Sequence, residues 1–357
     1  MKIQSIKALV LPTRPTVNFR IALPAQTNSS MLLVRVETDE GIVGFGEASP
    51  FALVTGCVEA DVLNFLDAMN TRLAGVEALA LERVHGLMDE YTLGNAPGKA
   101  AIDIALHDIW GKYAGMPLYR LLGGGSNTLV SDMTIGIDEP RVMAAEARRY
   151  VDEGFAILKI KVGLDPASDL EAVRLIREEV GPDIDLRIDA NQGWTTKQTL
   201  ATLRAMERYG VHEVEQPLKA DDLDGLRFVR ERASQDVMLD ETVHTPHDAW
   251  SALSAGTADI INIKLMKSGG LYPACRINAV AQAAGVPCMV GCMNESRVGI
   301  AAGAALVAAL DNIRYADLDS HRLFEELPGV TGGFEQTGGA IRLTEEPGLG
   351  VEVALEF

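Results

Sequence analysis

The chain of 357 residues lacks the features that mark membrane, secreted and nucleic-acid-binding proteins. No run of 18 apolar residues is present, so we expect no membrane-spanning helix. The first residues contain no basic stretch followed by a long apolar one, so we expect no secretory signal peptide and a cytoplasmic location. Lysine and arginine are scarce, 32 against 50 acidic residues, and the net charge is −18. Such a balance disfavours binding to nucleic acid and to anionic membranes.

Cysteine and histidine do not occur in the spacings that bind zinc. The four cysteines are Cys57, Cys275, Cys288 and Cys292, and no two of them form a C-x-x-C pair. None of the six histidines belongs to an H-E-x-x-H motif. The glycine run 123–125 lacks the lysine of a phosphate-binding loop, so we interpret it as a break between domains. We expect reduced thiols and histidines with structural or solvent-facing positions.

Strand and helix patterns alternate over most of the chain. Eight short apolar segments are predicted as strands, and they begin near residues 131, 156, 185, 212, 236, 259, 287 and 313. Helical patterns separate them, and several of these end in glycine, as helix C-termini commonly do. Repeated alternation of this kind is typical of a (β/α)8-type barrel, which we place at residues 127–320.

The residues on either side of the barrel complete the predicted α/β fold. Strand patterns, a tight turn at Asp39–Gly41 and helical patterns fill residues 1–126, which we expect to form an α+β capping domain. The polar segment 13–30 is predicted as a loop that closes over the substrate. The tail, residues 321–357, has alternating β patterns and glycine turns. We expect this tail to return to the capping domain and to pair with its strands.

Three acidic residues end three successive predicted strands. Asp189, Glu215 and Asp240 are separated by 26 and 25 residues, an interval that holds one strand and one helix. Equal intervals place the three side chains at equivalent strand ends, which meet at one cavity in a closed barrel. Any one of these acids alone would be an ordinary strand-end residue. Together they predict a site for a hard cation, and an octahedral Mg²⁺ would complete its shell with water and substrate oxygens.

Three lysines flank this predicted metal site along the chain. Lys159 and Lys161 lie two apart on one strand and so share a face, although a K-x-K pair alone is commonly a solvated edge pair. Repulsion between the two ammonium groups is expected to lower the pKa of one, which makes a base near neutral pH. Lys264 ends a strand 24 residues after Asp240. Bases on opposite faces of one carbon can remove a proton from one side and return it on the other, which inverts the stereocentre.

The motifs KIK, DAN, EQP, DE and NIKLMKSGG, in this order, resemble those of the enolase superfamily, muconate lactonizing enzyme subgroup. The resemblance covers essentially the whole chain, and residues 103–124 resemble the family's domain junction. It implies 1,1-proton transfer by the two lysines through an enediolate that Mg²⁺ stabilises. The mandelate racemase subgroup would have a histidine base at the seventh strand end, where this chain has Gly291–Met293.

Asp317 and Asp319 alternate at the end of the eighth predicted strand and therefore share a face. In the family, an Asp-x-Asp at this place binds the α-ammonium group of a dipeptide, as in L-Ala-D/L-Glu epimerases, and residues 292–296 also resemble dipeptide epimerases. The resemblance therefore implies a dipeptide epimerase that inverts the α-carbon of the second residue. A helix cap formed by Asp319 is the alternative interpretation.

The second residue of the dipeptide is predicted to be neutral or hydrophobic. Ala-Glu epimerases carry an arginine in the loop for the distal carboxylate, and in an ungapped alignment Pro24 stands at that position. Arg14 and Arg20 lie nearby, but Arg20 matches the family's ordinary basic position after a phenylalanine. Asn294, near the seventh strand end, favours a neutral or polar second residue unless it is a solvated loop residue.

Two other functions stay open on the sequence. The first keeps the fold and changes the reaction to that of N-succinylamino acid racemase, o-succinylbenzoate synthase or muconate cycloisomerase. Their anionic substrates give no reason for two additional acids at the eighth strand. The second is a non-catalytic metal-binding homologue, which would be expected to have lost a lysine or a ligand, whereas all six are present. A homo-oligomer and a monomer are both compatible with these patterns.

Overall fold

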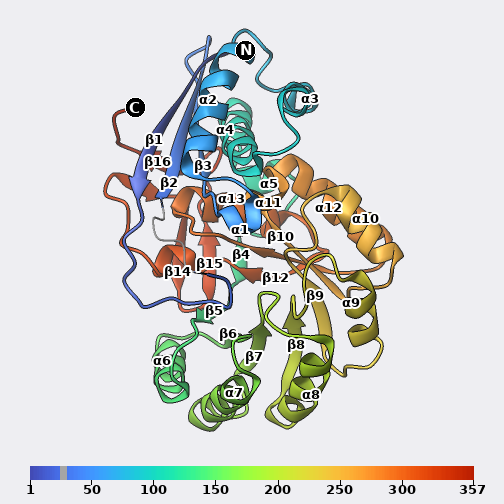
Figure 1. Ribbon diagram of the computed structural model, residues 1–357. Helices are drawn as coiled ribbons and strands as arrows, with labels where there is room; N and C mark the ends of the chain where they lie inside the picture. Colours follow the sequence, from blue (N-terminus) through green and yellow to red (C-terminus); the bar gives the residue numbers. More distant parts are fainter. Residues whose placement is uncertain (25–29) are drawn as a thin grey trace.

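The computed structural model describes residues 1–24 and 30–357, and its largest element is a sheet of eight parallel strands in chain order (Figure 1). These are β5 (Met133–Ile135), β6 (Ile157–Lys161), β7 (Asp185–Asp189), β8 (Val211–Glu215), β9 (Asp236–Leu239), β10 (Ile260–Lys264), β11 (Cys288–Gly291) and β12 (Ile313–Asp317). The amide of Asp132, just before β5, donates to the carbonyl of Ala316 in β12 at 3.1 Å. This contact brings the two edges of the sheet together, so the sheet closes as a barrel.

Helices cover the outside of the barrel between successive strands. They are α6 (Pro140–Asp152), α7 (Pro166–Val180), α8 (Thr196–Met206) with the short η1 (Glu207–Tyr209), α9 (Leu223–Arg230), α10 (Pro246–Ser254), α11 (Leu265–Ser268), α12 (Leu271–Ala283) and α13 (Arg297–Ala309). The strands β6, β7 and β8 alternate apolar with charged residues, and most residues of both kinds are buried. Each of the eight predicted strands overlaps an observed one, so the predicted fold class is confirmed.

A second group of elements lies above the barrel in Figure 1. It consists of an antiparallel sheet of β1 (Ile3–Pro12), β2 (Ser30–Thr38) and β3 (Val43–Ala48), followed by α1 (Ala52–Thr55), α2 (Glu59–Arg72), α3 (Leu81–Tyr91), α4 (Ala96–Ala114) and α5 (Leu118–Leu121). These elements have a buried apolar cluster of their own. The α4 helix joins this cluster to the barrel core, because its side chains contribute to both. The division at residues 126 and 320 stays a prediction.

Within the described residues, the tail forms no strand pair with β1, β2 or β3, so the expected pairing with the N-terminal strands is wrong. After η2 (Ser320–Arg322) it forms β13 (Val330–Gly332), β14 (Phe334–Thr337), β15 (Ala340–Leu343) and β16 (Val351–Val353). The β15 strand pairs with β4 (Thr128–Val130), and β13 pairs with β16. An alternating pattern defines a strand without defining its partner, and the β3 edge is packed against α4 instead. The chain end still reaches the N-terminal sheet, where the rings of Phe357 and Phe45 lie 6.1 Å apart.

The segment after β1 extends from the N-terminal sheet down to the barrel (Figure 1, dark blue). Its backbone is bound at several points: Thr16 N donates to Leu323 O at 2.9 Å, and Ile137 N donates to Arg20 O at 2.7 Å. The predicted loop 13–30 therefore lies against the barrel over residues 13–24, while residues 25–29 are outside the described residues. None of the helices in the described ranges combines the length and apolar character needed to cross a bilayer.

Candidate active site

Asp189, Glu215 and Asp240 converge at the C-terminal end of the barrel. Asp189 and Glu215 are the last residues of β7 and β8 and are register partners, and Asp240 directly follows β9. Adjacent strands bring one carboxylate oxygen from each residue to within 4.8 Å of the others. All three side chains are buried, at 3% exposure or less. The equal sequence spacing predicted this arrangement.

Lysines lie against these acids from both sides. Lys161 ends β6 with its Nζ 2.6 Å from Asp189 Oδ2, and Lys264 ends β10 with its Nζ 2.8 Å from Asp240 Oδ2. Since the strand order is β6 to β10, the three acids lie between these two ammonium groups. Lys159 reaches the middle of the set, with its Nζ 2.7 Å from Glu215 Oε2.

The pKa values around the acids shift in opposite directions. Burial raises the pKa of Glu215 to about 8, and neighbouring carboxylates add to this. Burial acts in the same sense on Asp240, but the ammonium group of Lys264 and a second lysine hold its pKa well below the ordinary range. Burial would lower the pKa of Lys159, but four nearby carboxylates raise it well above the usual value. The lowering expected from lysine–lysine repulsion is therefore not found at Lys159.

The donor set of the three acids fits a hard cation. Its ligand atoms are carboxylate oxygens, without histidine or cysteine, which is the preference of Mg²⁺. Two more buried acceptors, Asn191 Oδ1 and Glu241 Oε2, have no donor within the part of the chain that the structure describes. Asn191 Nδ2 lies 3.4 Å from Asp189 Oδ2, so these acceptors adjoin the set. Such unpaired acceptors could accept hydrogen bonds from the water molecules that a bound Mg²⁺ usually retains.

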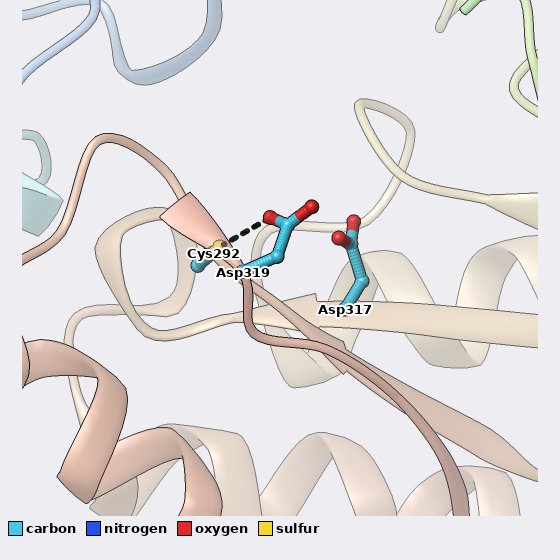
Figure 2. Close-up of side chains that lie close together, drawn as sticks. All are labelled: Cys292, Asp317 and Asp319. Carbon is cyan, nitrogen blue, oxygen red and sulfur yellow. Dashed lines mark hydrogen bonds between the residues drawn. The ribbon is translucent and has the colours of Figure 1, made fainter. Parts of the chain in front are cut away.

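A second acidic cluster lies where β11 and β12 end, and it consists of Cys292, Asp317 and Asp319. Figure 2 shows the carboxylates of Asp317 and Asp319 side by side, with the thiol of Cys292 next to Asp319. Lys159 Nζ contacts Asp317 Oδ2 at 2.7 Å, so Lys159 touches both clusters. Asp319 accepts from the amide of Thr134 at 2.6 Å and pairs with no lysine or arginine in the described ranges. Its side chain also forms no cap on η2, against the alternative interpretation.

Charge compensation in this second cluster is uneven. Burial would raise the pKa of Asp317, but Lys159 holds it below the ordinary value. Burial and the adjacent Asp317 carboxylate instead raise the pKa of Asp319 to about 6. A cation beside Asp319 would relieve this, because an opposite charge favours the ionised form.

A cavity of about 400 Å³ connects both clusters and extends to the N-terminal segments. Lys161, Asp240, Lys264, Asp317 and Asp319 line its barrel side. Apolar side chains dominate the opposite wall, and these are Val17, Phe19, Ile21, Leu23, Pro24, Phe51, Val54, Met293, Leu323 and Phe324. Arg20 and Asn294 also line the cavity, so the structure brings every predicted substrate-contacting residue to one space. Asp189, Glu215 and Lys159 lie beneath it.

The sequence interpretation missed several residues of the site. Lys267 is buried, and its Nζ lies 2.5 Å from Asp240 Oδ1. It could have been identified within NIKLMKSGG, three residues after Lys264. Asn262 donates to Glu215 Oε1 at 2.8 Å and lies on the same strand face as Lys264. Thr134 had no sequence signal, because its backbone amide makes the contact with Asp319.

Two family models together match nearly the whole chain. The model described as enolase C-terminal domain-like matches residues 142–357, and the N-terminal domain model of mandelate racemase and muconate lactonizing enzyme matches residues 5–123.

Curated relatives align over almost their full length. The hydrophobic dipeptide epimerase of Enterococcus faecalis strain V583 is 41% identical, covering 98% of this chain and 99% of its own. The crystal structure of the dipeptide epimerase from that strain, complexed with Mg and L-Leu-L-Tyr, has a TM-score of 0.96 and covers 99% of this chain and 100% of that chain. The L-Ala-D/L-Glu epimerase of Bacillus subtilis is 40% identical, with coverage of 98% and 97%. The N-succinyl-L-Arg/Lys racemase of Bacillus cereus is 35% identical, with coverage of 99% and 96%.

Proposed function

The chain belongs to the enolase superfamily, in its mandelate racemase and muconate lactonizing enzyme branch, and we propose that it is a cytoplasmic, Mg²⁺-dependent dipeptide epimerase. The family and the isomerase class agree with the prediction from the sequence motifs. The observation that carries the proposed substrate class is the second acidic cluster. Asp319 is buried there without a basic partner in the described residues, in the same cavity as Lys161 and Lys264.

The acids Asp189, Glu215 and Asp240 would hold the Mg²⁺ ion. When bound, the ion supplies electrostatic stabilisation to the negative charge that develops on the substrate carboxylate. The protein's part is to hold the three carboxylates in place and to keep Asp189 and Asp240 ionised. Lys264 and Lys267 do this for Asp240 by holding its pKa low, against the effect of burial.

Lys161 and Lys264 would transfer the α-proton of the second residue. They end β6 and β10, which are four strands apart in a barrel of eight and so lie on opposite sides of its mouth. One Nζ would take the proton from one face of the α-carbon, and the other Nζ would return a proton to the other face. Positioned acid–base groups contribute about 10²- to 10⁴-fold each to a reaction of this kind.

Asp317 and Asp319 would bind the free α-ammonium group of the dipeptide. Lys159 compensates Asp317, so the cluster has about one negative charge left for a substrate cation. This contact fixes the first residue of the dipeptide and places the α-carbon of the second residue between the two lysines. The substrate then loses its translational and rotational entropy on binding, so the activation barrier of proton transfer is lower. An N-succinyl amino acid would instead bring a carboxylate towards Asp319.

The cavity wall supports neutral or hydrophobic side chains in the dipeptide. Val17, Phe19, Phe51 and Val54 present apolar surface, and Pro24 offers no charge to a distal carboxylate. Desolvated apolar side chains would gain about 25 cal/mol per Å² buried against this wall. Arg20 also lines the cavity, and its backbone carbonyl is held by Ile137.

A substrate panel tests this proposal. The values of kcat/KM should be highest for apolar L,L-dipeptides, lower for L-Ala-L-Glu, and lowest for N-acetylated dipeptides and N-succinyl amino acids. Pro24→Arg should improve L-Ala-L-Glu relative to L-Ala-L-Leu. Excess EDTA should abolish all activity, and Mg²⁺ should restore it. Fastest turnover of N-succinyl amino acids would favour the racemase alternative instead.

A further inference from the structure

Glu47 is a buried carboxylate that joins the N-terminal sheet to the barrel. It lies near the end of β3 with 0% of its surface exposed. Its Oε1 accepts from the amide of Ser296 at 2.7 Å, and its Oε2 accepts from the Ser296 hydroxyl at 2.5 Å and the Gly299 amide at 3.1 Å. Three donors at the start of α13 therefore converge on one side chain that lies 249 positions away from Ser296 along the chain.

Close packing of the β3 backbone against α4 fixes the position of Glu47. A Cβ placed on Gly46 would lie 1.9 Å from the carbonyl oxygen of Ala101 in α4, and one on Gly44 would lie 2.1 Å from that of Ala105. Only glycine allows β3 to approach α4 this closely. The Glu47 side chain is consequently presented to α13 from a rigid base.

Both segments joined by Glu47 lead directly into the cavity. On one side, residues 49–51 follow β3, and Ser49, Pro50 and Phe51 line the cavity. On the other side, residues 292–294 precede Ser296 and line the wall next to Asp319. The contact therefore spans two walls of one binding space.

The loop on the barrel side is tied in turn to the second acidic cluster. Ser320 Oγ accepts from the amide of Glu295 at 3.1 Å and donates to its carbonyl at 3.0 Å. Ser320 directly follows Asp319 in the chain. Glu47 is hydrogen-bonded to Ser296, the preceding residue Glu295 is hydrogen-bonded to Ser320, and Ser320 follows Asp319 in the chain.

Burial of the Glu47 carboxylate has a desolvation cost that its hydrogen bonds offset only in part. Burial raises the pKa of Glu47 to about 7, even though its three hydrogen bonds oppose the shift. An apolar or amide side chain would avoid that desolvation cost. What an ionised group adds is short, strongly directional hydrogen bonding, which fixes geometry.

We propose that Glu47 is a positioning residue for substrate binding, which holds the 49–51 wall and the 292–294 loop in one relative arrangement. The inference rests on the proposed dipeptide epimerase function and adds a residue to it. Glu47 touches neither the predicted metal ligands nor the lysines, so it acts on the fit of the dipeptide rather than on proton transfer.

The matched control is Asp103, which makes a similar contact elsewhere. Asp103 lies in α4 with 0% exposure and accepts from the amides of Leu271 and Tyr272 at the start of α12, at 2.5 and 3.3 Å. Neither it nor those two residues line the cavity. Asp103 Oδ2 also lies 2.7 Å from His85 Nε2, so Asp103→Asn weakens a buried carboxylate junction with an additional partner, outside both walls.

The experiment measures kcat, KM and thermal unfolding for Glu47→Gln, Ser296→Ala, their double mutant and Asp103→Asn, with the dipeptide that the wild type turns over best. We expect Glu47→Gln to raise KM about tenfold while kcat stays within about twofold. Ser296→Ala should raise KM about threefold, and the double mutant should add little to Glu47→Gln, because both remove one coupled contact. Asp103→Asn should lower the unfolding temperature and leave KM unchanged.

Several outcomes overturn the inference. An unchanged KM in Glu47→Gln, a loss confined to kcat, or an equal rise of KM in Asp103→Asn each contradicts a positioning role. Ser296→Ala keeps the backbone amide and serves as the second variant if Glu47→Gln does not fold. A wild type that turns over no dipeptide overturns the proposed function together with this inference, whereas a dipeptide-active wild type with an indifferent Glu47→Gln overturns this inference alone.

Discussion

Two acidic clusters lie at the same end of the barrel, and their charge is compensated differently. Asp189 and Asp240 each contact a lysine ammonium group within 3 Å and have lowered pKa values, against the effect of burial. Asp319 has no such partner among the described residues, and burial raises its pKa to about 6. Two of the three acids of the first cluster are thereby kept ionised for a dication, while burial raises the pKa of the third, Glu215, to about 8. The second cluster keeps a single uncompensated acid, which suits a monovalent cation supplied by the substrate.

The difference follows from which strands supply the lysines. Lys161 and Lys264 rise from β6 and β10, on either side of β7 to β9. Among the lysines of the described residues, Lys159 alone contacts Asp317, and its Nζ also contacts Glu215. The predicted metal site, at the ends of β7 to β9, and the second acidic cluster, at the end of β12, are thereby on separate strands, with Lys159 in contact with both.

The largest expected effect is on the first cluster. Asp240→Asn removes one predicted ligand and leaves Lys264 and Lys267 without their carboxylate. We expect epimerase activity to fall by at least about a thousandfold, or roughly 4 kcal/mol of transition-state stabilisation. Binding of Mg²⁺, measured by calorimetry, should fall in parallel while circular dichroism shows a folded chain. Wild-type activity in this variant would remove the first cluster from the mechanism.

The second largest effect is expected for the two lysines, because each predicted base acts on one face of the substrate α-carbon. Lys161→Ala and Lys264→Ala should each reduce epimerisation by about 10²- to 10⁴-fold. Solvent exchange of the α-proton should survive from one stereoisomer only, and the surviving isomer should differ between the two variants. Proton NMR in D₂O, started separately from the L,L and L,D dipeptides, measures both rates. Equal exchange from both isomers in either variant would contradict the two-base assignment.

Asp319→Asn should have a smaller effect, since it removes recognition and leaves proton transfer intact. Loss of a hydrogen bond to a charged group predicts a fall in kcat/KM of about 10- to 100-fold for a free dipeptide. An N-acetylated dipeptide, already a poor substrate, should lose nothing further in this variant. A similar loss with both substrates would mean that Asp319 does not contact the ammonium group.

The smallest expected effect is the pH dependence of kcat/KM that arises from Asp319 in the second cluster. Asp319 must be ionised to pair with an ammonium group. Because its pKa is raised to about 6, this ionisation should determine the acidic limb of the plot of kcat/KM against pH. The ionised fraction grows as pH rises through that value, so kcat/KM should increase about tenfold per pH unit below it and level off above it. Asp319→Asn should remove this limb, and a limb that persists unchanged would belong to another group.

The sequence was sufficient for the barrel and for the strand-end residues because both depend on local spacing. Asp189, Glu215 and Asp240 recur at the length of one βα unit, and closure of the barrel then forces them together. The partner of a strand or a side chain from a distant segment is not encoded in spacing. For this reason the pairing of β15 with β4 and the contact of Glu47 with Ser296 emerged only from the fold.

The raised pKa of Lys159 shows that residues close in sequence are also not enough to predict a pKa. The K-x-K pair was visible in the sequence, and repulsion between its ammonium groups was a sound expectation for two isolated lysines. The position of Asp317, on a strand 158 residues further along, could not enter that expectation. Electrostatics in a barrel mouth depends on all strand ends together, so repulsion between two lysines does not by itself determine the pKa of Lys159.

Deuterium incorporation is the most direct test of the central claim, which is inversion of the second residue of a dipeptide held by its ammonium group. The wild-type enzyme with Mg²⁺ would be incubated in D₂O with L,L-dipeptides, N-acetylated dipeptides and N-succinyl amino acids, and the products analysed by fragment mass spectrometry and chiral chromatography. The account predicts one deuterium per molecule at the α-carbon of the second residue of free dipeptides, with the L,D product formed alongside. Deuterium at the first residue, or faster incorporation into N-succinyl amino acids, would contradict it.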